Sequence, residues 1–416
     1  MEPYLALIGF NILFFWKYYR NPFLACTSEL ASTFFPYLIY QGRHGNKDEQ
    51  IYYYFPRCIP FLSTFYPLNF GIACLSRLLT LDVAFRLYQA MINIHLLIGS
   101  CFAFYVFSSW TSPILALVGA LSVAYGGYAV KIYQPCIPYT MAWLPGMLLP
   151  GPIGGICFGM AILAGYWPIL IYFAPFALLA QFHWGYSWGW LGLGLLIGSP
   201  QICTFLWYLP QSVRAKGKSI CNKLGKVPIY RFLNIIWPDR SIKKINGVLS
   251  QEMAMYLGLL PFFIFFSKSL IWWVLGFCTL GMVGLFPLIP RIPARWTHLF
   301  SFSLAWLAID GLTRANFSDK VLIVLALLQA FLLLQNRVYL NYGVFTEWWK
   351  KPSDFWPSYS KLYNNSSITS YNSVFPHFTG YMTETVTPGY TGGFALQWMH
   401  DKYGITDPNG ERITHA

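Results

Sequence analysis

The stretch VAFRLYQAMINIHLLIGSCFAFYVFS, residues 83–108, gives the clearest indication of fold class in this chain. From Leu87 to Ser108 it contains no Asp, Glu, Lys or Arg. Its apolar residues form a continuous run and lack the inward and outward alternation of a barrel strand. A helix is the conformation that pairs the backbone N–H and C=O groups of such a run within hydrocarbon. We therefore predict a membrane-spanning helix over this range.

The composition extends this interpretation to the whole chain. Of 416 residues, 56% are hydrophobic, 19% are aromatic and 10% are charged. A soluble domain usually carries about 25% charged residues, so polar residues are too few here to cover a water-facing surface. The predicted fold class is an all-α polytopic membrane protein with about 10–11 transmembrane helices.

Further apolar runs predict the other spans and divide the chain into regions. They cover residues 4–16, 112–130, 137–150, 152–167, 168–183, 187–209, 253–268, 270–289, 297–313 and 320–336. The first run is interpreted as an uncleaved span, and the short run at 137–150 as a span or a re-entrant segment. Residues 1–336 then form a transmembrane domain with a first long loop at 17–82 and a basic loop at 211–251. Residues 337–416, which are rich in Ser, Asn, Tyr and Trp, are predicted to form a small extramembrane tail.

The number of spans between the long loops predicts which of them share a face. Six runs separate the first long loop from the basic loop, and four separate the basic loop from the tail. An even number of crossings returns the chain to the same side, so all three regions are expected on one face, together with any chemistry. The opposite face has tight connections, such as residues 184–186 and 314–319.

Charge and cysteine content exclude some functions. The formal net charge is +13 at pH 7, and the Lys and Arg residues lie in loops between apolar runs. This placement predicts contact with lipid headgroups or anionic lipid-linked substrates, and no nucleic-acid partner. The nine cysteines lack a CxxC spacing. We interpret them as small packing residues, so no metal or redox site is predicted.

Acidic residues are scarce, and Glu29 is the candidate for catalysis. It follows the first span within CTSELASTFFPYLIYQGRHGNKDEQIYYYFPRCIPFLSTFYP. A carboxylate among aromatic residues at the membrane surface can act as a general base toward an acceptor hydroxyl that attacks an activated sugar. The structural alternative is an N-cap or first-turn residue, since Thr27 and Ser28 precede an amphipathic run. Asp48 and Glu49 are interpreted as residues of a solvated turn.

Several blocks of the chain occur in an order that resembles a known family. They are SEL, FFPYLIYQG and FLSTFYPLNF in the first long loop, followed by INIHLLIGSCFAFYVF, LVGALSVAYGGYAVKIYQPCIPYTMAWLPGMLL, RFLNIIWPDR and EMAMYLGLLPFFIFF. Their order, over roughly residues 1–290, resembles the bacterial YfhO-like membrane proteins, which are relatives of the GT-C glycosyltransferases. In that family an acidic residue after the first helix is followed by a pattern close to fPy…G…yP.

The resemblance implies a GT-C-like fold and an inverting glycosyltransferase of the bacterial inner membrane. Such an enzyme moves a sugar from a polyprenyl-phosphate carrier to a cell-envelope acceptor at the outer face. Glu29 then occupies the position of the family's candidate catalytic acid, where members usually have Asp. Members are commonly longer than this chain. The resemblance implies no cofactor, and a divalent metal is compatible with it but not required.

Basic and polar residues are the candidates for binding the carrier phosphate, since Arg or Lys neutralises charge on a departing phosphate. The candidate substrate-binding residues are Arg57, Arg77, Lys131, Gln134, Arg231, Asp239 and Arg240. Asp239 belongs to the Pro-Asp pair that the resemblance matches. Each basic residue has an alternative interpretation as a headgroup contact or a topology signal.

Two ionisable residues lie inside predicted spans. His95 is interpreted as a hydrogen-bonding residue in helix packing, although intramembrane ionisable residues are candidates for function. Asp310 lies four residues before Arg314, and we predict an ion pair between them.

The positive-inside rule and the family resemblance put the long loops on opposite sides of the membrane. We follow the resemblance, because long loops weigh less in the rule and a phosphate carrier needs positive charge nearby. Two other functions stay open: a transporter or flippase for a lipid-linked or amphiphilic solute, and a non-catalytic membrane subunit. Gly- and Pro-rich breaks at 145–155 and 285–291 favour the transporter.

Overall fold

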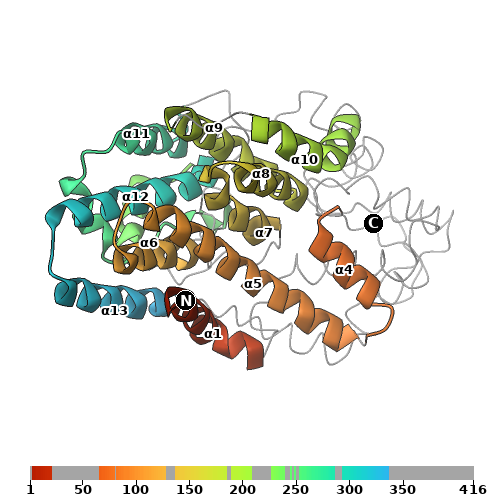
Figure 1. Cartoon of the computed structure of the whole chain (residues 1–416), viewed down its shortest axis with the longest axis horizontal. Coiled ribbons are helices and arrows are strands. Elements are labelled where there is room, and N and C mark those ends of the chain that lie inside the picture. The colour runs from red at the N-terminus through yellow and green to blue at the C-terminus, as the bar shows by residue number, and fades with distance from the viewer. Residues whose placement is uncertain are drawn as a thin grey trace, which may run out of the picture. The chain divides into compact units, whose positions relative to one another are not determined.

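The computed structural model describes residues 2–20, 65–79, 81–127, 136–184, 189–208, 226–238, 244–245, 248–249, 253–285 and 293–336. These parts are mainly helical (Figure 1), which confirms the all-α class in its coarse form. Strand structure within the described ranges consists of one antiparallel pair, β1 (Lys244–Ile245) with β2 (Val248–Leu249).

The chain divides into two units. Unit 1 comprises Met1–Arg20, Ala90–Gly198 and Ser219–Tyr339, and unit 2 comprises Asn21–Gln89, Ser199–Lys218 and Leu340–Ala416. The described part of unit 2 contains α4 (Pro67–Leu75), which lies in the first long loop. Two helices, α5 (Leu81–Ser108) and α10 (Gly189–Tyr208), have residues in both units.

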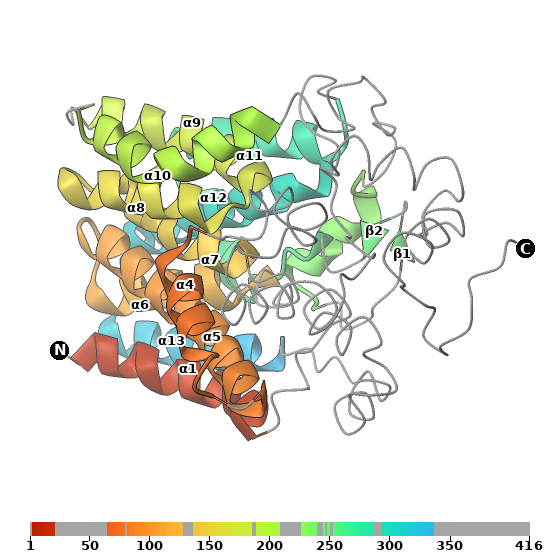
Figure 2. The ribbon, with the colours of Figure 1, turned by 90° about the vertical axis from the view of Figure 1, so that its right-hand side faces the viewer.

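Unit 1 contains the other helices, of which those numbered η are 3₁₀-helices. They are α1 (Glu2–Arg20), α6 (Pro113–Tyr125), α7 (Cys136–Trp143), η5 (Pro145–Leu148), α8 (Pro152–Ala164), α9 (Trp167–His183), η8 (Ile229–Ile235), η10 (Leu260–Phe266), α11 (Ile271–Met282), η11 (Pro293–Trp296), α12 (Thr297–Ala315) and α13 (Asp319–Gln335). Figure 2 shows α1, α8 and α9 as stacked rods with roughly parallel axes.

The centre of unit 1 is α12, which is buried from its first residue to Leu312, apart from the half-buried Asp310. Aromatic rings from several helices surround it. Phe302 lies 6.4 Å from Phe107 of α5 and 5.3 Å from Phe173 of α9, measured between ring centroids. These contacts hold α5, α9 and α12 together.

The helices α8 and α10 approach each other through glycines. A Cβ atom on Gly155 would lie 2.2 Å from the carbonyl oxygen of Trp190, and one on Gly198 would lie 2.6 Å from Ile162. Gly159 and Gly194 are equally confined between the two helices. Each helix thus contributes a GxxxG pair, Gly155 with Gly159 and Gly194 with Gly198, which is the sequence feature that lets helix backbones come close in membrane proteins.

Most predicted spans correspond to helices, but one does not. For example, α6 lies within the predicted run 112–130, and α13 within 320–336 with one added residue at its start. The predicted helix at 253–268 is wrong, because residues 254–257 are non-helical and residues 260–266 form the 3₁₀-helix η10. The physical reason is Gly258, which has φ +65° and so departs from helical geometry.

Two helices among the described residues are long and apolar enough to cross a membrane. They are Arg86–Ser108 and Gly189–Leu206, within α5 and α10. Shorter apolar helices cover Pro113–Tyr125, Pro152–Ala164, Trp167–Phe182 and Ile271–Met282.

Candidate functional site

Most of the predicted site lies outside the described residues. This applies to Glu29, Arg57, Lys131, Gln134, Asp239 and Arg240. Arg77 and Arg231 are described. Arg77 is exposed in the turn after α4, where its N–H donates to the carbonyl of Cys74 at 3.3 Å, and it belongs to unit 2. Arg231 belongs to unit 1 and is the described candidate binding residue of that unit.

Arg231 is the buried residue of η8, with 5% of its surface exposed. Three contacts fix this short helix against unit 1. The N–H of Val227 donates to Met282 at the end of α11, the N–H of Leu257 donates to Ile235, and the ring of Phe232 lies 5.7 Å from that of Phe300 in α12. A guanidinium is buried at little cost only where it has interaction partners, and that of Arg231 lies 6.0 Å from the ring centre of Tyr230.

Contacts within unit 1 show which helix ends lie together. Asn336, directly after α13, donates from its amide to the carbonyls of Tyr125 and Gly126 at the end of α6. The start of α1 lies beside the C-terminal part of α5, since Tyr4 is 5.3 Å from Phe104, and its later residues pack on Tyr125. We call the region of Tyr125, Asn336 and the later residues of α1, with η8 and the start of α12, the loop end.

The opposite end of unit 1, the turn end, carries the short connections. Thr111 and Thr313 share a hydrogen bond of 2.8 Å, and Trp306 stacks between Trp110 and Trp184 at 5.2 and 6.0 Å. The three long loops, which counting spans predicts on one face, lie mostly outside the described residues, so their common face stays a prediction. The basic-loop helix η8 and the C-terminal ends of α1 and α13 share the loop end, while the connections near residues 184 and 314 share the turn end.

The predicted pair of Asp310 and Arg314 is confirmed at the turn end. The Arg314 Nε donates to both carboxylate oxygens of Asp310, at 3.2 and 3.1 Å. The same carboxylate accepts from the Ser267 hydroxyl at 2.6 Å and from the backbone N–H of Lys268 at 3.2 Å. Because these bonds tie α12 to the turn before α11, Asp310 has a structural role.

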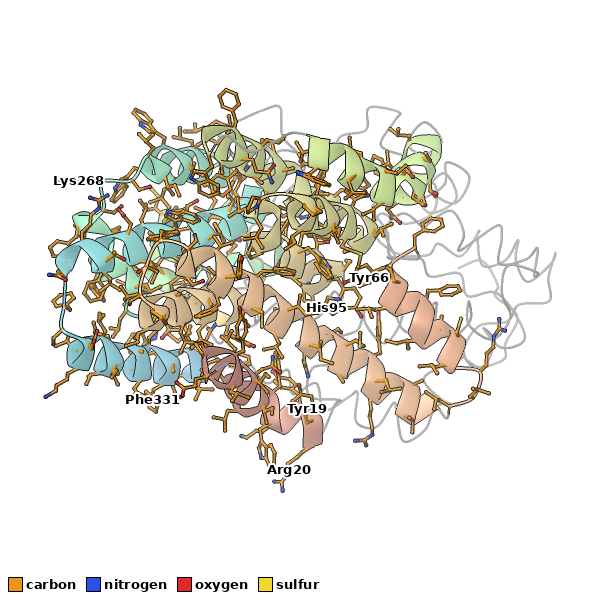
Figure 3. All side chains as sticks on the ribbon, viewed as in Figure 1. Tyr19, Arg20, Tyr66, His95, Lys268 and Phe331 are labelled. Carbon is orange, nitrogen blue, oxygen red and sulfur yellow. The ribbon has the colours of Figure 1, made fainter. Side chains whose placement is uncertain are left out.

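His95 lies inside unit 1 (Figure 3) and is completely buried. Its Nδ1 lies within hydrogen-bond distance of the Met91 carbonyl on the preceding turn, and its ring is 4.1 Å from that of Tyr139. This environment agrees with the interpretation of His95 as a packing residue.

A polar cluster around Gln329, near the loop end, was not predicted from the sequence. Its side-chain bonds satisfy backbone groups of a non-helical segment. The Gln329 amide donates to the Ser122 hydroxyl and to the Leu257 carbonyl, both at 2.8 Å, and its oxygen accepts the Leu259 N–H at 2.9 Å. A Cβ on Gly258 would lie 2.5 Å from the Gln329 oxygen, so this position requires glycine for space as well as for φ. The isolated glutamine within the apolar run 320–336 was a signal that could have identified the cluster.

Comparison with known proteins adds no relative. No family model, no curated protein and no solved structure matches this chain. The resemblance to YfhO-like proteins therefore stays a prediction from the sequence.

Proposed function

We propose that the chain is a multi-spanning membrane protein in which the apolar segments make ten or eleven crossings. The observation that carries the proposal is the inverted polarity of helices in unit 1. On α13, Val324, Leu327 and Phe331 are 62%, 68% and 56% exposed, whereas Gln329 is 2% exposed. Figure 3 shows Phe331 on the outer side of this helix. A helix of a soluble protein has the opposite arrangement.

The same polarity occurs elsewhere in unit 1. Trp273 of α11 is 80% exposed and Phe265 of η10 is 81% exposed, and α1 exposes Leu5 and Leu13. Large apolar side chains exposed on several helices are the arrangement that lipid would cover. The interior contains hydrogen-bonded polar groups. The Asn11 amide, for example, donates to the Tyr125 hydroxyl at 2.8 Å and to the Asn93 carbonyl at 3.1 Å.

Short helices fit this proposal when their neighbouring segments are included. The 13-residue helices α6 and α8 are each about 20 Å long, and the hydrocarbon core is about 30 Å thick. A complete crossing then needs the flanking turns, whose backbone groups have to be satisfied by protein. The Gln329 side chain satisfies backbone groups of the non-helical segment before η10, because it bonds to the Leu257 carbonyl and the Leu259 N–H.

Cysteine labelling in native membranes tests the membrane location. We expect Leu327→Cys to resist a membrane-impermeant maleimide until SDS is added, and Lys320→Cys, at the exposed start of the same helix, to react at once. Mass spectrometry of the α13 peptide reads the modification separately from the native cysteines. Rapid labelling of Leu327→Cys in sealed or open membranes would rule out a lipid-facing α13.

For the activity, we propose transfer of a sugar from a polyprenyl-phosphate carrier to a cell-envelope acceptor at the bacterial inner membrane. The support is the sequence resemblance, the position of Glu29 after the first span, and the buried Arg231 at the loop end. Glu29 would accept the proton of the acceptor hydroxyl, and cationic residues would neutralise the leaving phosphate.

The activity is tested by sugar transfer from a radiolabelled polyprenyl-phosphate sugar to envelope material. Glu29→Gln keeps the shape of the side chain and removes its basicity, so we expect loss of transfer by at least about 100-fold with normal membrane insertion. Glu49→Gln is the matched control, and it should retain transfer. Equal activity of the two variants would remove Glu29 from the mechanism.

A transporter or flippase is the second candidate, and one structural observation favours it. Residues 254–257 are non-helical and lie next to Gly258 and the 3₁₀-helix η10. Interrupted helices of this kind often line solute sites in transporters. Movement of a lipid-linked solute across proteoliposomes, without a covalent product, would favour this function over sugar transfer.

A further inference from the structure

The outward side of η8 is apolar, although this helix belongs to the basic loop. In a 3₁₀-helix the side chains of residues i and i+3 lie above one another, so Tyr230, Leu233 and the C-cap residue Ile236 form one row. Arg231 and Asn234 form another row. The first row is 61%, 69% and 43% exposed, whereas the second is buried at Arg231 and half-buried at Asn234. A surface helix in water has the opposite arrangement.

The inner side of η8 is fixed to unit 1 along its length. Before the helix, the N–H of Val227 donates to the Met282 carbonyl at 3.0 Å, and at its end the Ile235 carbonyl accepts the N–H of Leu257 at 2.9 Å. Between these bonds the ring of Phe232 packs on α12. Because of these contacts, η8 cannot rotate to bury its apolar row without losing them.

The beginning of η8 lies beside the end of an apolar helix. Met282 is the last residue of α11, which contains no charged residue. A Cβ on Gly284, just after α11, would lie 2.7 Å from the Cε atom of Lys226. In the proposed membrane arrangement α11 is part of a crossing, and a lysine beside the end of a crossing extends toward the headgroups. The structure therefore places the start of η8 next to the segment that would leave the membrane there.

The residues around η8 have the composition of a membrane interface. Trp237, two residues after the helix, is 76% exposed, and Ile229 at its start is 82% exposed. Trp and Tyr are enriched at the level of lipid headgroups, because their rings combine an apolar body with a polar group. The apolar row thus continues into a residue type that is typical of this level.

The charge of the basic loop favours anionic lipid as the partner of this row. Residues 211–251 contain nine Lys and Arg residues and one acidic residue, Asp239. Basic segments of this kind are attracted to a leaflet with anionic headgroups. The C-terminal tail is less complementary, because residues 337–416 contain six acidic and six basic residues.

We propose that η8 is an interfacial segment, with Tyr230, Leu233, Ile236 and Trp237 inserted at the acyl boundary of a leaflet that contains anionic lipid. Interfacial helices bind in this way, through an apolar face in the membrane and basic residues at the headgroups. The inference rests on the proposed membrane location and does not require sugar transfer. It moves residues 229–237 from a water-exposed loop to the membrane surface.

Photocrosslinking of the full chain in vesicles of phosphatidylcholine and phosphatidylglycerol tests the inference. The photoreactive residue p-benzoylphenylalanine replaces Leu233 or Trp237, and mass spectrometry identifies the crosslinked molecules. We expect lipid adducts at both positions, with phosphatidylglycerol enriched about twofold or more over its share in the vesicles. The same replacement at Leu327, on the outer side of α13, is the control for lipid contact and should give adducts in proportion to the vesicle composition. Replacement of the buried Phe302 should give protein crosslinks alone.

A paired change of basic residues tests the contribution of charge. Lys243→Gln together with Lys244→Gln should lower the enrichment of phosphatidylglycerol at Leu233 and keep the lipid adducts, because the apolar row is unchanged. Arg314→Gln, at the turn end, is the matched control and should keep the enrichment. Adducts at Leu233 that follow the vesicle composition in the unmodified loop would overturn the assignment to anionic lipid.

The outcomes separate this inference from the proposed function. Lipid adducts at Leu327 but not at Leu233 or Trp237 overturn the inference and leave the membrane location standing. Crosslinks from Leu233 to residues 337–416 or to a second copy of the chain also overturn it, because they assign the row to a protein contact. Absence of lipid adducts at all three positions contradicts both proposals. Loss of sugar transfer in Glu29→Gln with unchanged adducts would support both.

Discussion

The two ends of unit 1 handle charge differently. At the turn end, the described acidic and basic side chains compensate each other, as in the contacts of Asp310 with Arg314 and Ser267. At the loop end, the side-chain amides of Gln329 and Asn336 bond to backbone groups of Leu259 and Gly126, and Arg231 and Arg295 are basic residues of η8 and η11. The described turn end therefore contains an ion pair, whereas at the described loop end uncharged side-chain amides satisfy backbone groups.

Disruption of the glycine contact that joins α8 and α10 should have the largest effect on stability, because the backbones leave no room for a side chain there. Gly155→Leu inserts a side chain where a Cβ already lies 2.2 Å from the Trp190 carbonyl. We expect a loss of about 3 kcal/mol or failure to fold, measured by unfolding of the purified protein in mixed SDS micelles. Gly192→Leu is the control, because Gly192 is exposed on α10 with no atom within 4 Å of its added Cβ. Similar losses in the two variants would contradict the packing described for this contact.

The second-largest loss of stability is expected from a substitution at the loop end. Gln329→Leu keeps the approximate volume but leaves the Leu257 carbonyl, the Leu259 N–H and the Ser122 hydroxyl without this partner. We expect a loss of about 2–3 kcal/mol in the same unfolding assay, because unsatisfied buried groups cost about 1–3 kcal/mol each and part of the cost is relieved by relaxation. Gln335→Leu, at an exposed position of α13, should cost less. A stability equal to that of the unmodified protein would show that the hydrogen bonds of Gln329 do not contribute to folding stability.

Substitutions at the turn end should lower the free energy of unfolding by less. Asp310→Ala removes the acceptor for the Ser267 hydroxyl and the Lys268 N–H, for an expected loss of about 1 kcal/mol. Arg314→Ala should cost less than Asp310→Ala, since the Arg314 side chain is 48% exposed and solvent screens its ion pair. Thermal unfolding of both variants measures the order, and a larger effect of Arg314→Ala would assign the stabilisation to the ion pair.

The smallest effect is expected at Thr313. Thr313→Val removes the exposed hydroxyl bond to Thr111 and keeps the branched shape of the side chain. We expect a change in Tm corresponding to about 0.5 kcal/mol, because water can replace the lost partner. A decrease as large as that of Gln329→Leu would mean that the turn end is held as firmly as the loop end.

The candidate site was only partly accessible to prediction. Arg231 was selected from the basic loop for its charge, and the structure adds that it is buried. The contact of Phe232 with Phe300, which places η8 beside α12, joins segments about seventy residues apart in the chain, so no local pattern could predict it.

The sequence by itself determined the helical class, the positions of most helices and the i, i+4 pair of Asp310 and Arg314, since hydropathy and local spacing act within one segment. Tertiary structure alone decided that residues 254–257 are non-helical and that Gln329, some seventy residues later, bonds to the adjoining backbone. The same is true of the glycine contact between α8 and α10. Hydrogen bonds and close approaches between distant segments depend on how helices pack, and no local pattern contains that information.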